Sequence, residues 1–148
     1  MLRINKTSEY GVLALRFIGQ MNQALSARQI SEGLNLPYEI TAKTLQHLKE
    51  AGLIQSSMGT NGGYTLKSSL EQISFAQIID ALEGPISIVE CASHGEKECT
   101  RSSSCELQDG MKTLNMKIRN LLEETKLSTF VKPEDKPNVF IKAETKIS

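Results

Sequence analysis

The most informative stretch for the fold is residues 26–66, which read SARQISEGLNLPYEITAKTLQHLKEAGLIQSSMGTNGGYTL. The stretch opens with a capping box, in which the side chains of Ser26 and Gln29 can satisfy free amides at the start of a helix. A short helix is therefore expected over 27–34. The turn NLP follows, and a second helix is expected over 38–51.

A hairpin closes the stretch. Gly52 is the usual left-handed end of a helix, and two short extended runs then flank a glycine- and asparagine-rich segment at 59–63. This pattern predicts a β-hairpin. With one more helix in front, the order of elements is that of a winged helix-turn-helix DNA-binding domain. The alternative is a generic small helical domain with a surface hairpin.

The flanking sequence supplies further helices. Residues 5–22 carry apolar side chains at helical spacing on one face, namely Tyr10, Leu13, Ala14, Phe17, Ile18 and Met21. A second capping box, formed by Ser74 and Gln77, begins a helix over 75–83 that Gly84-Pro85 ends. The expected fold class is mainly α with a small β-hairpin wing.

A long helix is expected from Glu106 to about Thr125. Its apolar residues follow steps of 4, 3, 4 and 3 and form a heptad seam of Leu107, Met111, Leu114, Ile118 and Leu121. The seam could pack against its own domain. Pairing with a second subunit is favoured, because the seam is strict and the opposite face is polar, with Lys112, Asn115, Lys117 and Arg119.

The chain is therefore divided into four parts. Residues 1–84 form the winged helix-turn-helix domain, 85–105 a cysteine-bearing loop, 106–127 a dimerisation helix and 128–148 an extended or disordered tail. The 148 residues suit one domain with an extension, and 39% are hydrophobic, without tryptophan. No apolar run is long enough for a membrane helix, and the N-terminus lacks the apolar stretch of a signal peptide, so a cytoplasmic location is expected.

Net charge is zero overall but uneven along the chain. Residues 1–70 hold seven Lys and Arg against four Asp and Glu, whereas 71–148 hold ten against thirteen. The mildly basic front half agrees with an anionic partner there. Catalysis is not expected, because the two histidines lie far apart in the sequence, and no nucleophile elbow, phosphate loop or His–Glu metal motif is present.

The helix over 38–51 is the candidate reading helix. Its inward stripe is expected to be Ile40, Thr44, Leu45 and Leu48. The exposed residues near its start are the best candidates for base contacts. The candidate DNA-binding residues are Tyr38, Glu39, Ala42, Lys43 and Gln46 on this helix, Ser26, Arg28 and Gln29 before it for phosphates, and Met58, Thr60 and Asn61 on the wing.

All three cysteines fall within fifteen residues, as Cys91, Cys99 and Cys105. An odd number in a cytosolic chain is not a disulfide framework, so thiolate chemistry or metal ligation is indicated. Together with His94 the three thiolates also make an acceptable zinc set. On the residues alone, zinc and an iron–sulfur cluster are equally open, and a metal-free thiol switch is a third reading.

Several segments of the chain are similar to those of a known family. They are LRI at 2–4, EYGV at 9–12, LQHLKEAGLI at 45–54 and GTNGGYTL at 59–66, and the cysteine loop and a long helix follow them. The sequence resembles the IscR/NsrR-type iron–sulfur winged-helix transcription regulators, the Rrf2 family, over about residues 1–125. The resemblance implies a homodimeric transcription regulator, acting as a repressor, that binds palindromic double-stranded DNA. It favours control of iron–sulfur assembly genes, with nitric oxide or redox stress as the alternative signal.

The resemblance also implies the ligands. Cys91, Cys99 and Cys105 would hold a 4Fe–4S or 2Fe–2S cluster. Some members use a histidine three residues after the last cysteine, but Gln108 stands there. Others use a carboxylate from the first helix of the partner, which corresponds to Glu9, with His94 as the local alternative. Family wings often carry an arginine where this chain has Met58.

Overall fold

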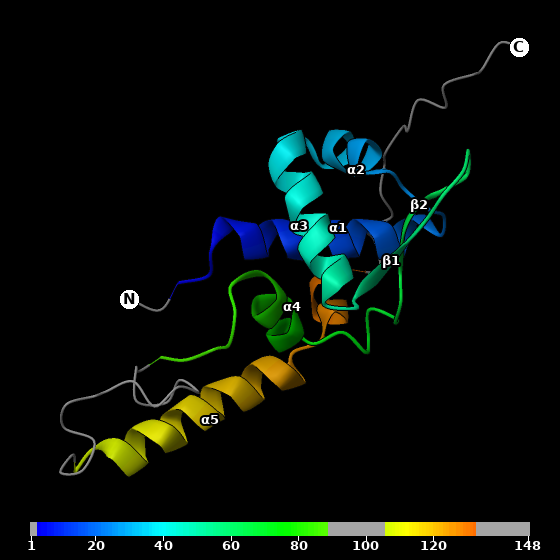
Figure 1. The fold of residues 1–148 in the computed structure, drawn as a ribbon. Coiled ribbons are helices and arrows are strands. Elements are labelled where there is room, and N and C mark those ends of the chain that lie inside the picture. The colour runs from blue at the N-terminus through cyan, green and yellow to red at the C-terminus, as the bar shows by residue number, and fades with distance from the viewer. Residues whose placement is uncertain (1–2, 89–105, 133–148) are drawn as a thin grey trace, which may run out of the picture.

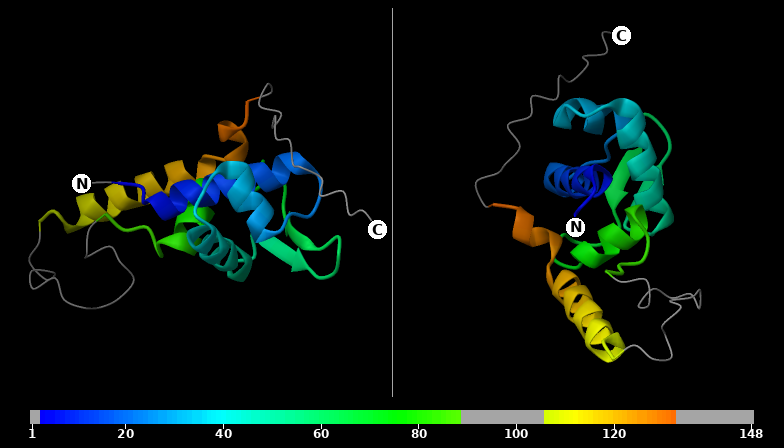
Figure 2. Two further views of the ribbon diagram at one scale, coloured as in Figure 1. Left: turned by 90° about the horizontal axis from the view of Figure 1, so that it is seen from above. Right: turned by 90° about the vertical axis from the view of Figure 1, so that its left-hand side faces the viewer.

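The computed structural model describes residues 3–88 and 106–132. The elements in these ranges are α1 (Lys6–Met21), α2 (Ala27–Leu34), α3 (Tyr38–Glu50), β1 (Ile54–Ser57), β2 (Gly63–Leu66), α4 (Phe75–Leu82), α5 (Gln108–Glu124) and the 3-10 helix η2 (Leu127–Phe130). The strands pair antiparallel, so the predicted mainly helical fold with a hairpin wing is confirmed. Figure 1 shows α2, the start of α3 and the hairpin tip at one end of the molecule and α5 at the opposite end. The same separation is visible from a second side in Figure 2.

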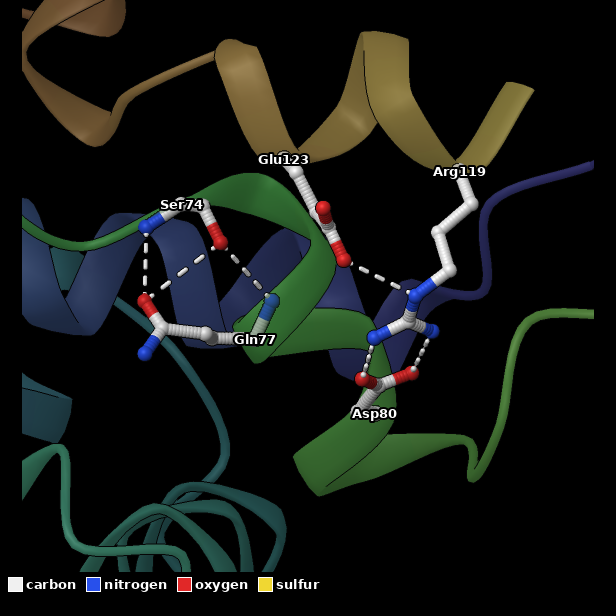
Figure 3. Close-up of polar contacts among 5 residues, drawn as sticks. All are labelled: Ser74, Gln77, Asp80, Arg119 and Glu123. Carbon is white, nitrogen blue, oxygen red and sulfur yellow. Dashed lines mark hydrogen bonds and ion pairs between the residues drawn. The ribbon is translucent and has the colours of Figure 1, made fainter. Parts of the chain in front are cut away.

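Both capping boxes form as predicted. The Ser26 hydroxyl oxygen accepts the Gln29 amide at 3.1 Å, and the Gln29 side chain accepts the Ser26 amide at 2.9 Å. Ser74 and Gln77 repeat this arrangement at the start of α4, with distances of 3.2 and 2.9 Å (Figure 3). Because both partners of each box lie within four residues, the sequence pattern alone locates these two helix starts.

The core lies where α1 meets α3, α4 and the base of the hairpin, and it is almost wholly aliphatic. Gly52 adopts the left-handed conformation at φ 78°, which turns the chain so that Leu53 packs back into this core. The buried hydrophobic residues are Ala14, Leu15, Phe17 and Ile18 of α1, Leu45 and Leu48 of α3, and Leu25, Ile30, Leu53, Ile54, Ile73, Ile78 and Leu127 from the other segments. In the described part of the chain, no helix is long and apolar enough to cross a membrane.

The inward face of α3 differs from the prediction at one position. The sequence places Ile40 inside, but its side chain is 44% exposed, and Thr41 is buried instead. The Thr41 hydroxyl donates to the Pro37 carbonyl, and the Thr44 hydroxyl donates to the Ile40 carbonyl, both at 2.8 Å. Each threonine thus satisfies its own hydroxyl within the helix and can be buried at low cost. The buried face is therefore turned toward Thr41, and Ile40 lies outside.

The wing is fastened to the helical domain by a third extended segment. Ile54 of β1 lies opposite Leu66 of β2, and Tyr64 exchanges two backbone hydrogen bonds with Leu25, at 3.1 and 2.7 Å. A Cβ atom at Gly63 would lie 2.5 Å from the Leu25 backbone, and φ there is 145°, so this position requires glycine. The base of the wing is therefore hydrogen-bonded to the segment that immediately precedes α2 in the chain.

Helix α5 runs along α4, and none of its described residues is buried. The Arg119 guanidinium donates to both Asp80 carboxylate oxygens, at 3.3 and 2.9 Å, and to Glu123 at 2.9 Å (Figure 3). The hydrogen bond to Asp80 is the main cause that raises the pKa of Arg119. Asn115 accepts the Ile88 amide at 3.0 Å. The sequence predicts Asn115 and Arg119 on the polar outer face, but hydrogen bonding turns both toward their own domain.

The end of the described chain packs more closely than the sequence predicts. An extended or disordered tail is expected from Ser128, but Ser128 to Phe130 belong to η2. Leu127 is fully buried, and its amide donates to the Ile73 carbonyl at 2.9 Å. Burial of this leucine against α1 and the segment before α4 outweighs the polar character of its neighbours. The remainder of the predicted tail, from 133 onward, lies outside the described residues.

Candidate nucleic-acid interface

The first turn of α3 lies at the end of the molecule away from α5 (Figure 1). Tyr38, Glu39 and Lys43 are exposed, and Ala42 is half-buried. Among the described residues, neither the Glu39 carboxylate nor the Lys43 ammonium has an ion-pair partner. Gln46 donates weakly to Glu50, at 3.3 Å. This helix therefore offers a free acceptor and a free cation to a ligand in front of it.

The polar side chains at the start of α2 make more intramolecular contacts than those at the start of α3. The side chains of Ser26 and Gln29 are both engaged in the capping box. The Arg28 guanidinium lies 5.2 Å from the centre of the Tyr38 ring and 3.9 Å from the Glu32 carboxylate. Both partners of Arg28 are at the surface, so the guanidinium can still reach a phosphate. Phosphate contacts by these three residues stay a prediction.

The wing tip is open to solvent. Met58 is fully exposed, and Thr60 and Asn61 are exposed beside it. Gly59 has φ 106°, and a Cβ atom there would meet nothing within 4 Å. The hairpin reaches the same end of the molecule as α2 and the start of α3 (Figure 1). The tip is thus free to approach a nucleic-acid backbone together with these helices.

The cysteine segment lies outside the described residues, and so does His94. The described residues on either side of this segment both lie next to α5. The Ile88 amide donates to Asn115 of the helix, and Glu106 is followed by Leu107, the N-cap residue of the helix. By donor chemistry the three cysteines fit an iron–sulfur cluster, since thiolates are its usual ligands and a carboxylate or imidazole can complete the set. Within the described ranges, no three His, Cys, Asp or Glu side chains converge on a possible metal site.

Glu9, the predicted partner ligand, lies in the first turn of α1 with its side chain at the surface. It pairs with Lys6 at 2.6 Å, and this hydrogen bond raises the pKa of the Lys6 ammonium. Its own chain does not bury the carboxylate, so a second chain can reach it. The role of Glu9 as a ligand stays a prediction.

One contact near Glu9 escapes sequence reasoning. The Glu83 carboxylate, at the end of α4, accepts the Asn5 amide at 3.0 Å and the hydroxyl of buried Ser8. It therefore caps the N-terminus of α1 in place of a local side chain. Because the cap comes from more than seventy residues away, no local pattern could have indicated it.

The chain has the features of a winged helix-turn-helix protein. These are the order of its helices, a solvent-exposed first turn on α3, and a β-hairpin hydrogen-bonded to the segment before α2. Within that class, the chain matches the model of the Rrf2 family, described as an iron-dependent transcriptional regulator, over residues 4–133. The chain belongs to this family.

Individual relatives agree with the assignment. The HTH-type transcriptional repressor NsrR of Streptomyces coelicolor is 24% identical over 114 residues, which cover 75% of this chain and 76% of that protein. CymR, the global cysteine regulator of B. subtilis, superposes with a TM-score of 0.66 at 26% identity, covering 89% of this chain and 100% of that one. IscR of T. potens shares the fold, with a TM-score of 0.62 at 23% identity over 87% and 85% of the two chains. This chain is accordingly a transcriptional regulator rather than an enzyme.

Proposed function

We propose that this protein is a homodimeric, sequence-specific repressor in the cytoplasm whose affinity for a palindromic promoter site is switched by an iron–sulfur cluster. The observation that carries the proposal is the distance within the molecule between the candidate DNA-binding surface and the helix next to the cysteine segment. The free first turn of α3 lies at one end, and α5, on which the cysteine segment is anchored, lies at the other (Figure 1). A regulator needs such a separation, because its ligand must change DNA affinity without occupying the DNA surface.

The exposed leucines along α5 and at its N-cap support a dimer. Leu107, Leu114 and Leu121 recur every seven residues and are 65%, 46% and 63% exposed, while Met111 and Ile118 between them are half-buried. A second copy of the same helix is the partner whose chemistry this stripe matches, because an isologous contact pairs each leucine with an apolar residue of equal spacing. Two reading helices related by a two-fold axis would then bind a palindromic site.

A charge in the middle of this stripe tests the dimer. Leu114→Glu is expected to convert the protein from dimer to monomer at micromolar concentration in sedimentation velocity, because two glutamates would face each other in an apolar contact. The fold of the single chain should be unaffected, since Leu114 is not buried. Asn120→Glu introduces the same side chain at another exposed position of α5 and should stay dimeric. A dimeric Leu114→Glu protein would exclude this stripe as the interface.

The cluster would be held by Cys91, Cys99 and Cys105, with Glu9 of the partner subunit as fourth ligand and His94 as the alternative. Both 4Fe–4S and 2Fe–2S clusters suit three thiolates. When bound, such a cluster supplies iron centres that gain and lose electrons. A ligand from the partner's first helix would make loading depend on how the two subunits are arranged.

The chain's own contacts offer a route from the cysteine segment to the DNA-binding domain. Asn115 holds the start of the segment on α5, and Arg119 holds α5 on Asp80 of α4. Glu83 of the same α4 then caps α1. A displacement of α5 would therefore be passed to α1, which packs directly against α3. These contacts support coupling between α5 and the reading helix through packed, hydrogen-bonded elements.

We favour iron–sulfur status as the signal, with control of the cluster-assembly genes, and nitric oxide or redox stress as the alternative. A metal-free thiol switch is a second candidate, favoured by the likeness to CymR. The CymR of Staphylococcus aureus, which is 26% identical to this chain, has a crystal structure in an oxidized form. A structural zinc site with His94 is the third.

Anaerobic purification of the full chain, with iron, sulfide and zinc analysis and a visible absorption spectrum, separates these candidates. The expected result is a coloured protein with equal amounts of iron and sulfide. One zinc per chain without colour would overturn the cluster and return His94 to the ligand set. A protein with neither metal would leave the thiol switch.

A further inference from the structure

The first turn of α3 shows an inversion of the usual rule for apolar residues. Thr41 and Thr44 are buried, whereas Ile40, in the first turn of the helix, is 44% exposed. The inversion is built in, because each threonine hydroxyl is satisfied by a carbonyl one turn earlier. Ile40 is not part of the buried core cluster.

The neighbours of Ile40 are the free polar side chains of the reading helix. Residues three or four apart lie side by side on a helix, so Lys43 stands next to both Glu39 and Ile40. The Tyr38 ring is held toward α2 by the Arg28 guanidinium, 5.2 Å away. This part of the α3 surface thus exposes one acceptor, one cation and one branched aliphatic side chain.

We infer that Ile40 is a specificity-determining residue that reads the 5-methyl group of a thymine in the major groove. This inference rests on the proposed DNA-binding function and names the base that one part of the surface selects. The thymine methyl is the apolar group that base edges present in the major groove, and aliphatic side chains recognise it by contact. Glu39 and Lys43 offer hydrogen-bonding groups to the neighbouring base edges or phosphates.

The test removes the methyl group and the side chain separately. DNA duplexes are first selected from a random pool by the wild-type protein, in its cluster-loaded and its metal-free form. Each thymine of the selected site is then replaced by deoxyuridine, which lacks only the methyl group, and Kd is measured at constant salt. One thymine per half-site is expected to lose about fourfold in affinity on replacement, the factor for about 0.8 kcal/mol per buried methyl-sized group.

The same measurement with Ile40→Ala shows whether the loss of affinity on removal of the thymine methyl depends on the Ile40 side chain. The variant is expected to bind thymine and deoxyuridine duplexes equally and to keep the wild-type melting temperature, because alanine favours helix and Ile40 is not in the core. Ile4→Ala, which shortens an isoleucine of 45% exposure outside the helix-turn-helix, should retain the fourfold discrimination. Lys43→Ala should weaken binding to every duplex and also retain it.

Three outcomes would overturn the inference. A site in which no deoxyuridine costs affinity excludes methyl reading, although the proposed DNA-binding function would stand. A penalty that persists unchanged in Ile40→Ala assigns the methyl contact to another residue. Loss of the dimer in Ile40→Ala, with discrimination retained, would assign the exposed side chain to a protein contact. Failure to select any duplex would instead overturn the proposed function itself.

Discussion

Cys99→Ala is expected to abolish cluster binding and to give the protein a single, signal-independent affinity for its DNA site. Loss of one of three thiolates leaves too few ligands to hold the iron atoms, so iron and sulfide should fall to a small fraction of the wild-type content. The DNA affinity of the variant should equal that of wild-type protein after chelation of the metal. The measurements are metal and sulfide analysis, the visible spectrum, and Kd for a selected duplex under anaerobic conditions.

The control for this experiment lies in the same segment. Ser103→Ala removes an oxygen close in sequence to the cysteines and should leave iron, sulfide and DNA affinity at their wild-type values. If Cys99→Ala loses the cluster but binds DNA as tightly as loaded wild-type protein, the cluster is not a switch. If it retains the cluster, Cys99 is not a ligand.

The same assay tests the fourth ligand. With Glu9→Ala, the thiolates remain and only the carboxylate at the start of α1 is lost. The cluster should still form but with an altered spectrum and faster loss in air, because one position is left to solvent or to His94. An unaltered spectrum and lifetime would remove Glu9 from the ligand set. Lys6→Ala, which takes away the carboxylate's present ion-pair partner, serves as the control for a purely local effect.

Leu127→Ala is expected to lower the free energy of unfolding by about 2–5 kcal/mol, the usual cost of a leucine removed from a well-packed core. Leu127 is fully buried although it follows the long exposed helix, and its backbone is bonded to Ile73 in the segment before α4. The loss would be a large part of the stability of a small domain. Urea denaturation followed by circular dichroism measures it.

Leu121→Ala provides the matched comparison, because this leucine is only six residues earlier and 63% exposed. In the single chain it should change stability by less than about 0.5 kcal/mol. If Leu121 also contributes to a dimer, its effect should depend on protein concentration, whereas that of Leu127 should not. Equal effects of the two substitutions would show that the chain after α5 is not part of the core.

Local sequence patterns account for the parts of this protein that depend on near neighbours. The capping boxes at Ser26 and Ser74, the left-handed end at Gly52 and the glycine-rich turn of the wing each act within a few residues, so pattern and structure agree there. The exposed first turn of the reading helix could also be placed, apart from Ile40.

The packing of the whole chain sets the contacts between residues far apart in sequence. It turned Thr41 inward and Ile40 outward, and the buried threonine satisfies its hydroxyl on the Pro37 carbonyl. It bonded Arg119 to Asp80, brought Glu83 to the start of α1 and buried Leu127. Periodicity gives the apolar face of a helix but not the segment that covers it, since burial and hydrogen-bond satisfaction are properties of the whole packed chain.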